Sequence, residues 1–190
     1  MEDRISKVPG EDNSSRVMLK RLHAAFALST QFLNPTFKRD RASPISVHYE
    51  GNFEVISVPD RVYLFITNSQ KIASIFPDVS ELKIIDDENF TLRARVGFSF
   101  FRGTMDVKLN WMEKRPVSLA RLKARATGMR STAELEATFT FEEKGQGTRI
   151  GWTVDAKVSG TIASVGSRII DIAAEKYTKQ IISSLQQSLS

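Results

Sequence analysis

Hydrophobic and polar residues alternate along most of the chain from Val47 onward, which is the period typical of β-strands. The first such stretch places Val47, Tyr49, Phe53 and Val55 on one side of a strand and polar residues on the other. Six more strands are predicted in succession, at about 81–86, 89–97, 103–112, 117–127, 132–143 and 147–158. Because the connections between these six are short and carry turn residues, the strands are expected to form an antiparallel meander.

Three helices are predicted around these strands. One covers 60–68 after Pro59, and a second short helix over 70–76 ends at Pro77. Because the third, at about 161–188, is the only element long enough to cover the apolar face of the sheet, we predict an α+β helix-grip fold. In this fold a curved seven-stranded antiparallel sheet surrounds a long C-terminal helix, and two short helices follow strand one. The apolar stripe of the long helix, at three- to four-residue spacing, is Ile162, Val165, Ile169, Ile172 with Ala173, Tyr177, Ile181 and Leu185.

The strand register can be predicted from charge. Turns centred on Met129-Arg130 and on 144–147 bring opposite charges together on one face of the sheet and apolar residues together on the other. A one-residue slip would destroy both arrangements. The predicted outer-face pairs are Arg125–Glu134, Lys123–Glu136, Glu142–Arg149 and the unfavourable pair Glu136–Asp155.

The first 44 residues differ from the rest of the chain. Residues 1–16 are polar and aperiodic, which predicts disorder, and 17–33 can form a short helix before a proline-punctuated linker. We predict a disordered or partly helical extension over 1–44 and one domain over 45–190. The main interpretations of 17–41 are a flexible tail and a basic amphipathic segment that makes peripheral contact with an anionic membrane. A cleaved signal peptide is less favoured because the apolar part around Ala24–Leu28 is short, and a start at Met18 is a further alternative.

Charge and composition exclude several classes of function. The net charge is +5, but residues 1–46 hold eight Lys/Arg against five Asp/Glu, so the folded part is close to balanced. A nucleic-acid-binding domain would need a basic face of its own, and none is predicted. The absence of cysteine excludes disulfides and thiolate zinc sites and fits a reducing compartment. We predict no metal and no cofactor other than a bound quinone or lipid.

The inward side of the predicted sheet is the candidate ligand site. Its positions are almost bare of titratable groups, and His48 falls on the outward side, so a catalytic role is not favoured. Small residues on both the sheet and the helix indicate a cavity, although a plain packed core remains the alternative. The predicted lining residues are Phe90, Leu92, Met105, Val107, Leu109, Trp111, Leu122, Ala124, Leu135, Phe139, Trp152, Val165, Ile169, Ile172 and Tyr177.

The segment from Gly160 to Asp171 joins the last strand to the long helix. Gly160 is expected to allow the turn, and Gly166 to set how closely the helix approaches the sheet. Arg168 and Asp171 are expected to tie the first turns of the helix to the edge of the sheet.

Several local motifs resemble one known family. They are Val58-Pro59-Asp60-Arg61-Val62-Tyr63, Ile75-Phe76-Pro77-Asp78-Val79, Arg95-Val96-Gly97-Phe98, Arg102-Gly103-Thr104-Met105, the Gly128 turn, Gly147-Thr148-Arg149, and the run from Val154 through Gly160 to Asp171. With the order of elements, they resemble the carbon monoxide dehydrogenase G-subunit (CoxG) family, within the START-like, birch-pollen-allergen-like (SRPBCC) superfamily, over about 50–188.

The resemblance implies a non-catalytic, cytoplasmic accessory protein. Such a protein would link a CO dehydrogenase or related molybdenum hydroxylase to the inner face of the membrane and its quinone pool, and its apolar cavity would hold a quinone or other lipid-like molecule. The alternative that the superfamily offers is a cyclase-like or lipid-transfer protein with its own small-molecule chemistry.

Overall fold

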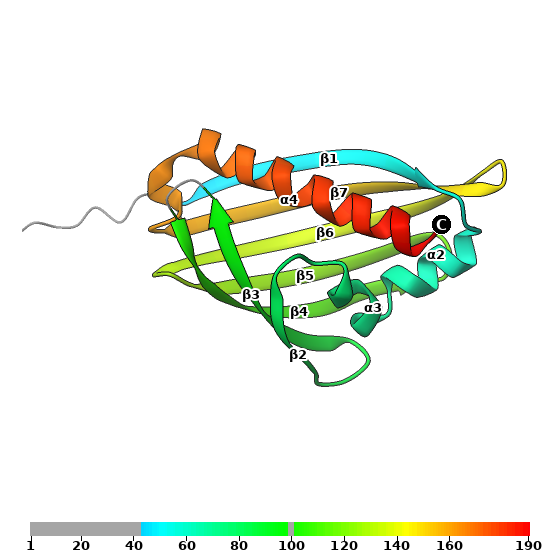
Figure 1. Ribbon diagram of the computed structural model, residues 1–190, viewed down its shortest axis with the longest axis horizontal. Coiled ribbons are helices and arrows are strands. Elements are labelled where there is room, and N and C mark those ends of the chain that lie inside the picture. The colour runs from blue at the N-terminus through cyan, green and yellow to red at the C-terminus, as the bar shows by residue number, and fades with distance from the viewer. Residues whose placement is uncertain (1–42, 99–100) are drawn as a thin grey trace, which may run out of the picture. The chain divides into compact units, whose positions relative to one another are not determined.

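The computed structural model describes residues 43–98 and 101–190, so nearly all of the predicted 1–44 extension, including 17–41, lies outside the described residues. The described part contains seven strands, two short helices, a 3₁₀ turn and one long helix (Figure 1). In chain order these are β1 (Ile45–Val55), α2 (Pro59–Ile66), α3 (Ser69–Ser74), β2 (Val79–Ile84), β3 (Asn89–Phe98), β4 (Phe101–Arg115), β5 (Leu119–Gly128), β6 (Ser131–Lys144), β7 (Gly147–Gly160), η1 (Ala163–Val165) and α4 (Ser167–Ser188).

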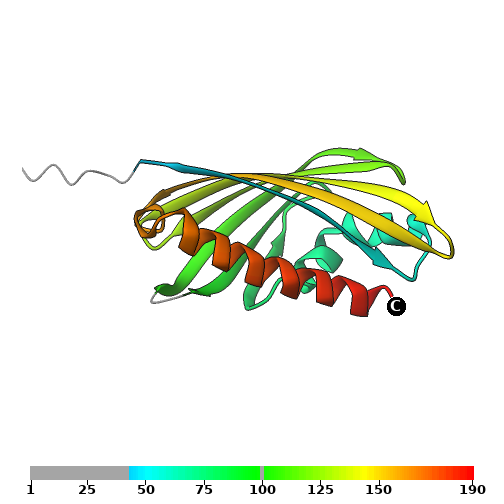
Figure 2. The same ribbon diagram turned by 90° about the horizontal axis from the view of Figure 1, so that it is seen from above.

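All seven strands form one antiparallel sheet in the order β1-β7-β6-β5-β4-β3-β2. The meander from β2 to β7 places sequential strands side by side, and β1 closes the order by pairing with β7. The sheet curves, and α4 lies along its inner side (Figure 2). The predicted α+β helix-grip fold is therefore confirmed.

The predicted register is also confirmed. Lys123 lies opposite Glu136, with 3.4 Å between Nζ and Oε1, while Arg125–Glu134 and Arg149–Glu142 pair at 3.2 and 3.9 Å. Glu136 lies opposite Asp155, which is the unfavourable pair that the register predicts. The repulsion is offset because Asp155 is 2.7 Å from Nδ1 of His48 on β1, so each carboxylate has its own cationic or hydrogen-bonding neighbour. The hydrogen bond to Asp155 raises the pKa of His48, which favours its charged form here.

The apolar core consists of two clusters, one at each end of the sheet. The larger cluster joins α2, α3 and the C-terminal end of α4 to the sheet, with residues such as Val62, Ile66 and Leu185. The smaller cluster lies where β7 passes into η1 and includes Val158, Ile162 and Ile170. The two ends are therefore closed by packed side chains.

The joint between β7 and α4 differs in part from the prediction. Gly160 has φ +82°, and a Cβ there would lie 2.2 Å from the carbonyl oxygen of Arg130, so the turn requires glycine. The α-helix begins at Ser167, not near 161, because η1 and Gly166 at φ +86° come first. A Cβ at Gly166 would meet nothing within 4 Å, so the expectation that Gly166 sets the helix–sheet distance is wrong.

The amphipathic α4 spans 22 residues. Neither this helix nor any other in the described part of the chain combines the length and apolar character that crossing a membrane requires.

Candidate ligand site between the sheet and helix α4

The inner face of the sheet is apolar from edge to edge, but its burial is uneven. Many side chains of this face are fully buried in the two clusters, whereas a second group is only partly buried and packs against the larger cluster, although α4 lies over this face (Figure 2). Their partial burial leaves some apolar surface of the inner face accessible. The group consists of Val107, Leu135, Phe139, Trp152 and Val154, with Ile181 and Ile182 from α4.

Two tyrosines attach α4 to opposite sides of the sheet. On β1, at one edge, Tyr49 Oη donates a hydrogen bond of 2.7 Å to Asp171 Oδ1. Near the other edge, the Gly97 N–H on β3 donates a 3.0 Å hydrogen bond to Tyr177 Oη. These two contacts hold the first half of α4, and Ile181 and Ile182 in its second half pack against the larger core cluster.

Asp171 therefore ties the first turns of α4 to the sheet, as predicted. Burial, and then the hydrogen bond to Asp171, raise the pKa of Tyr49, so its hydroxyl stays protonated and able to donate. Arg168 is exposed, and no hydrogen bond or ion pair joins it to another described residue, so its predicted tethering role is not found.

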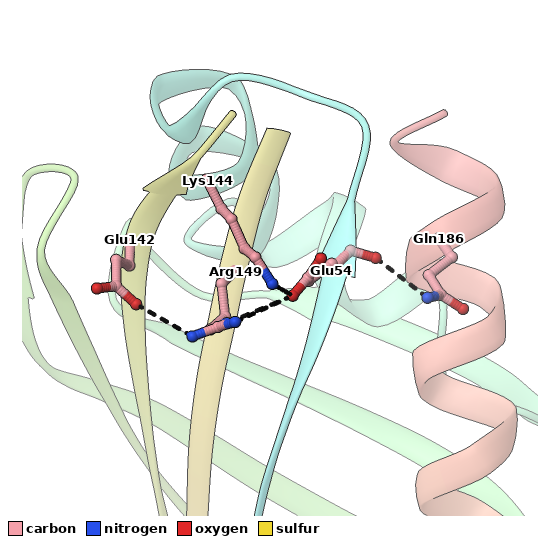
Figure 3. Close-up of polar contacts among 5 residues, drawn as sticks. All are labelled: Glu54, Glu142, Lys144, Arg149 and Gln186. Atoms are coloured by element: carbon pink, nitrogen blue, oxygen red, sulfur yellow. Dashed lines mark hydrogen bonds and ion pairs between the residues drawn. The ribbon is translucent and has the colours of Figure 1, made fainter. Parts of the chain in front are cut away.

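The C-terminal end of α4 contacts β1 at Glu54, whose carboxylate pairs with two cationic side chains (Figure 3). Gln186 Nε2 donates a 3.1 Å hydrogen bond to the Glu54 carbonyl oxygen. The Glu54 carboxylate accepts from Lys144 and, at 3.3 Å, from Arg149 Nη2. The hydrogen bond from Lys144 lowers the pKa of Glu54, so this carboxylate stays charged under mildly acidic conditions.

The predicted lining residues are fully buried, partly buried or, in the case of Ile172, exposed. Seven lie fully within the core: Phe90, Leu92, Met105, Leu109, Trp111, Leu122 and Ala124. Six are partly buried: Val107, Leu135, Phe139, Trp152, Val165 and Ile169. Tyr177 is also partly buried and makes the contact with Gly97. The first group forms packed walls, and the second presents accessible apolar surface.

The structure corrects the prediction for Ile172. It is 58% exposed, so its predicted place in the lining is wrong. Ile170 is buried in addition to the predicted residues, and the rest of the predicted stripe in α4, through Ala173, Tyr177, Ile181 and Leu185, is buried or partly buried. The predicted stripe is therefore wrong at Ile172 alone.

Gly51 was not among the predicted site residues, yet it shapes the site. It lies opposite Trp152 in the β1–β7 pair, and a Cβ at this position would lie 2.8 Å from Cζ2 of the indole ring. The missing side chain therefore lets the large ring lie across β1. Strand parity offered a signal, because Gly51 interrupts the row of large apolar residues on its strand.

The indole Nε1 atoms of Trp111 and Trp152 are both buried, and neither has a hydrogen-bond partner among the described residues. These are the two tryptophans of the chain, and both belong to the inner face. Their fluorescence therefore reports on this face and on anything bound there.

The inner face around the partly buried group carries few acid–base side chains. His48 lies exposed on the outer face, as its strand parity predicted. In the described strands the inward positions are apolar around this group except for Tyr49, and the charged residues Lys114 and Glu143 take inward positions only at strand ends. Tyr63 packs edge-on against Phe141, with 5.5 Å between ring centroids, and burial raises its pKa. The same described residues contain no group of three or more acidic or histidine side chains placed to hold a metal ion.

Solved structures of low sequence identity share this fold. A conserved protein from Geobacillus kaustophilus aligns with a TM-score of 0.70 at 15% identity, covering 75% of this chain and 95% of its own. A START superfamily protein from Mycobacterium smegmatis aligns at 0.59 and 10% identity, with 75% and 96% covered. The Zhui aromatase/cyclase from Streptomyces sp. R1128 aligns at 0.57 and 11% identity, with 76% and 94% covered.

These likenesses show a shared helix-grip fold. The chain belongs to the carbon monoxide dehydrogenase G-subunit (CoxG) family, which it matches over residues 51–190. No curated protein matches the chain in sequence. The resemblance found in the motifs is confirmed, and the family and fold together support a protein that binds hydrophobic ligands.

Proposed function

We propose that the protein is a non-catalytic carrier that holds a lipid-like molecule, such as a quinone, between α4 and the inner face of the sheet. The observation that supports this proposal is the partly buried apolar group on that face, which keeps some accessible surface although α4 lies over it. An apolar ligand there would remove this surface from water and gain about 25 cal/mol for each Å² buried.

The chemistry of the walls supports a neutral, largely apolar ligand. Beside Val107, Leu135 and Val154 an ionised group would lose its hydration without gaining a charged partner from these side chains. The tyrosine hydroxyls stand at the borders of the apolar group, where a polar end of the ligand would lie. The alternative role as a cyclase is less favoured, because the inner walls offer aromatic and aliphatic contacts in place of acid–base side chains.

We further propose that the protein serves a CO dehydrogenase or related molybdenum hydroxylase and connects it with a membrane quinone pool. Membership of the CoxG family supports this part of the proposal. The predicted contact of residues 17–41 with a membrane is an independent expectation, to be checked by liposome flotation of the chain with and without residues 1–44. Equal flotation of the two forms would remove it.

Ligand binding can be tested by extracting the purified protein with organic solvent for mass spectrometry, and by titrating it with a short-chain quinone. We expect a co-purified apolar molecule and saturable quenching of tryptophan fluorescence. Val107→Phe fills part of the inner face and should weaken binding at least about tenfold, whereas Met112→Phe, at a 58% exposed position on the same strand, should not. If the parent protein shows no bound molecule and no quenching, the carrier role is ruled out.

The partner is tested separately by mixing the ligand-loaded protein with purified CO dehydrogenase. We expect co-migration in gel filtration and reduction of the bound quinone when CO is supplied. If the protein binds a ligand but shows neither co-migration nor quinone reduction, the carrier role stands and CO dehydrogenase is rejected as its partner.

A further inference from the structure

The two edges of the sheet differ in how they are covered. At the β1 edge, α4 supplies polar partners, because Gln186 donates to the Glu54 carbonyl and Asp171 accepts from Tyr49. At the opposite edge, every residue of β2 from Ser80 to Ile84 is exposed. Figure 1 shows β2 as the last strand on its side of the sheet, and among the described strands it pairs with β3 alone. An uncovered edge is a template for pairing with another strand.

The backbone of β2 offers a defined set of outward groups. The Ile85 N–H bonds to the Asn89 carbonyl of β3 at 3.0 Å. Because bonding direction alternates along an antiparallel strand, residues 81 and 83 also face β3, and the backbone groups of Leu82 and Ile84 face away from the sheet. Leu82 therefore presents both its N–H and its C=O to an incoming strand.

The side chains at this edge are self-complementary. Glu81 and Lys83 flank Leu82 on the outer face, while Leu82 and Ile84 lie on the inner face with 37% and 39% exposure. If two copies of β2 pair antiparallel about Leu82, Glu81 of each copy lies opposite Lys83 of the other. Opposite charges thus meet twice, and Leu82 meets its own copy on the inner face.

We propose that β2 is a homodimerisation edge, at which two copies of this chain pair antiparallel about Leu82 and join their sheets. A two-fold contact of this kind uses the same patch on both copies, and this is the condition that Glu81, Leu82 and Lys83 fulfil. The pairing also covers exposed apolar surface of Leu82 and Ile84. Because the edge is only six residues long, the dimer is weak and concentration-dependent.

Charges on an edge strand commonly oppose pairing, so their arrangement decides the matter here. Like charges opposite one another would block the dimer, but the symmetric register places Glu81 against Lys83. Glu81 already lies 3.4 Å from Arg93 within its own copy, which holds it on the outer face beside the edge. A second copy would add Lys83 to this pair without displacing Arg93.

The test is a charge swap in the full chain, followed by sedimentation velocity from about 5 to 500 µM. Lys83→Glu turns two attractive pairs into two repulsive ones and should raise the dimer dissociation constant about 30-fold. Glu81→Lys should act in the same direction. The double variant Glu81→Lys with Lys83→Glu restores opposite charges and should bring the constant back to within about threefold of the parent protein.

Arg61→Glu is the matched control, because it makes the same charge change at an exposed residue of α2. It should leave the dissociation constant unchanged, and melting temperatures of all variants should show intact folds. Hydrogen exchange gives a second readout: the amides of Leu82 and Ile84 should gain protection as the concentration rises. A monomer at all concentrations, a dimer insensitive to Lys83→Glu, or a double variant that folds but does not recover would each overturn the proposal.

Discussion

The contact between Tyr49 and Asp171 is the clearest test of how α4 is held over the inner face. Tyr49→Phe removes one hydroxyl at the edge strand and leaves the ring in place. The lost hydrogen bond is 2.7 Å long and has a carboxylate as its acceptor. Because it joins residues 122 positions apart in the chain, it stabilises tertiary structure only, and its loss should leave both the strand and the helix formed.

The expected size of the effect follows from the chemistry and exposure of the pair. Hydrogen bonds to charged groups contribute about 1.5–3 kcal/mol when sheltered. This pair lies at the solvent-exposed edge of the sheet, so we expect about 1 kcal/mol. For a domain of this size the loss corresponds to a fall of about 2–4 °C in melting temperature.

A double-mutant cycle measures the contact itself. Urea unfolding of the parent protein, Tyr49→Phe, Asp171→Ala and the double variant at neutral pH gives the coupling energy between the two side chains. The direction in which this contribution to stability changes with pH follows from the pKa of Tyr49. Since the pKa of Tyr49 is raised above its ordinary value of 10.0, its contribution is fully present below pH 10 and is lost as the pH rises through the raised pKa.

A coupling energy below about 0.3 kcal/mol would refute this reasoning, because additive losses would mean that the two groups do not act together. If urea unfolding of Tyr49→Phe is no longer cooperative, the reasoning is also refuted, because the contact would then stabilise more of the fold than the position of α4.

Three further comparisons test the fold and the site. Gly160→Ala should cost about 3 kcal/mol through clash and backbone strain, and Gly166→Ala, with open space, only about 1 kcal/mol; equal losses in urea unfolding would contradict the difference in packing. Leu185→Ala should cost about 3 kcal/mol, since its side chain is 2% exposed, against under about 0.5 kcal/mol for Ile172→Ala; a large loss at Ile172 would place it back in the interior. Because the pKa of Glu54 is lowered, its stabilising contribution is present above the ordinary pKa of 4.5 and is lost as the pH falls through the lowered pKa. Glu54→Gln should therefore reduce the pH dependence of the free energy of unfolding on the acid side. An unchanged pH dependence there would argue against the pairing of Glu54 with Lys144.

Much of the fold was predictable because its signals are local. Alternation of apolar and polar residues located all the strands, and charge pairs such as Lys123–Glu136 fixed the register. The boundaries were less predictable. Apolar residues between 161 and 166 are spaced as in an α-helix, but this segment forms a 3₁₀ turn followed by Gly166 with positive φ. The reason is that the chain must reverse its direction after β7 before the α-helix can begin.

The sequence predicted which residues lie on the inner face, but not how deeply each of them is buried. Strand parity placed Val107, Leu135 and Trp152 on the inner side. It could not distinguish them from Phe90 or Trp111, which have the same parity and are fully buried. The difference arises from what lies opposite each residue, and that depends on the path of α4 and on the end clusters.

The sequence by itself determined the order of elements, the register of the meander, the apolar inner face and membership of the family, because each follows from periodicity or from short motifs. Only the tertiary structure decided where α4 begins, the two tyrosine contacts that hold it, the partial burial of residues such as Val107 on the inner face, and the exposure of β2 at one edge of the described sheet. These features join residues far apart in the chain, such as Tyr49 with Asp171 and Gly97 with Tyr177. Their physical cause is the closure of a curved sheet around a helix, which no local pattern of residues records.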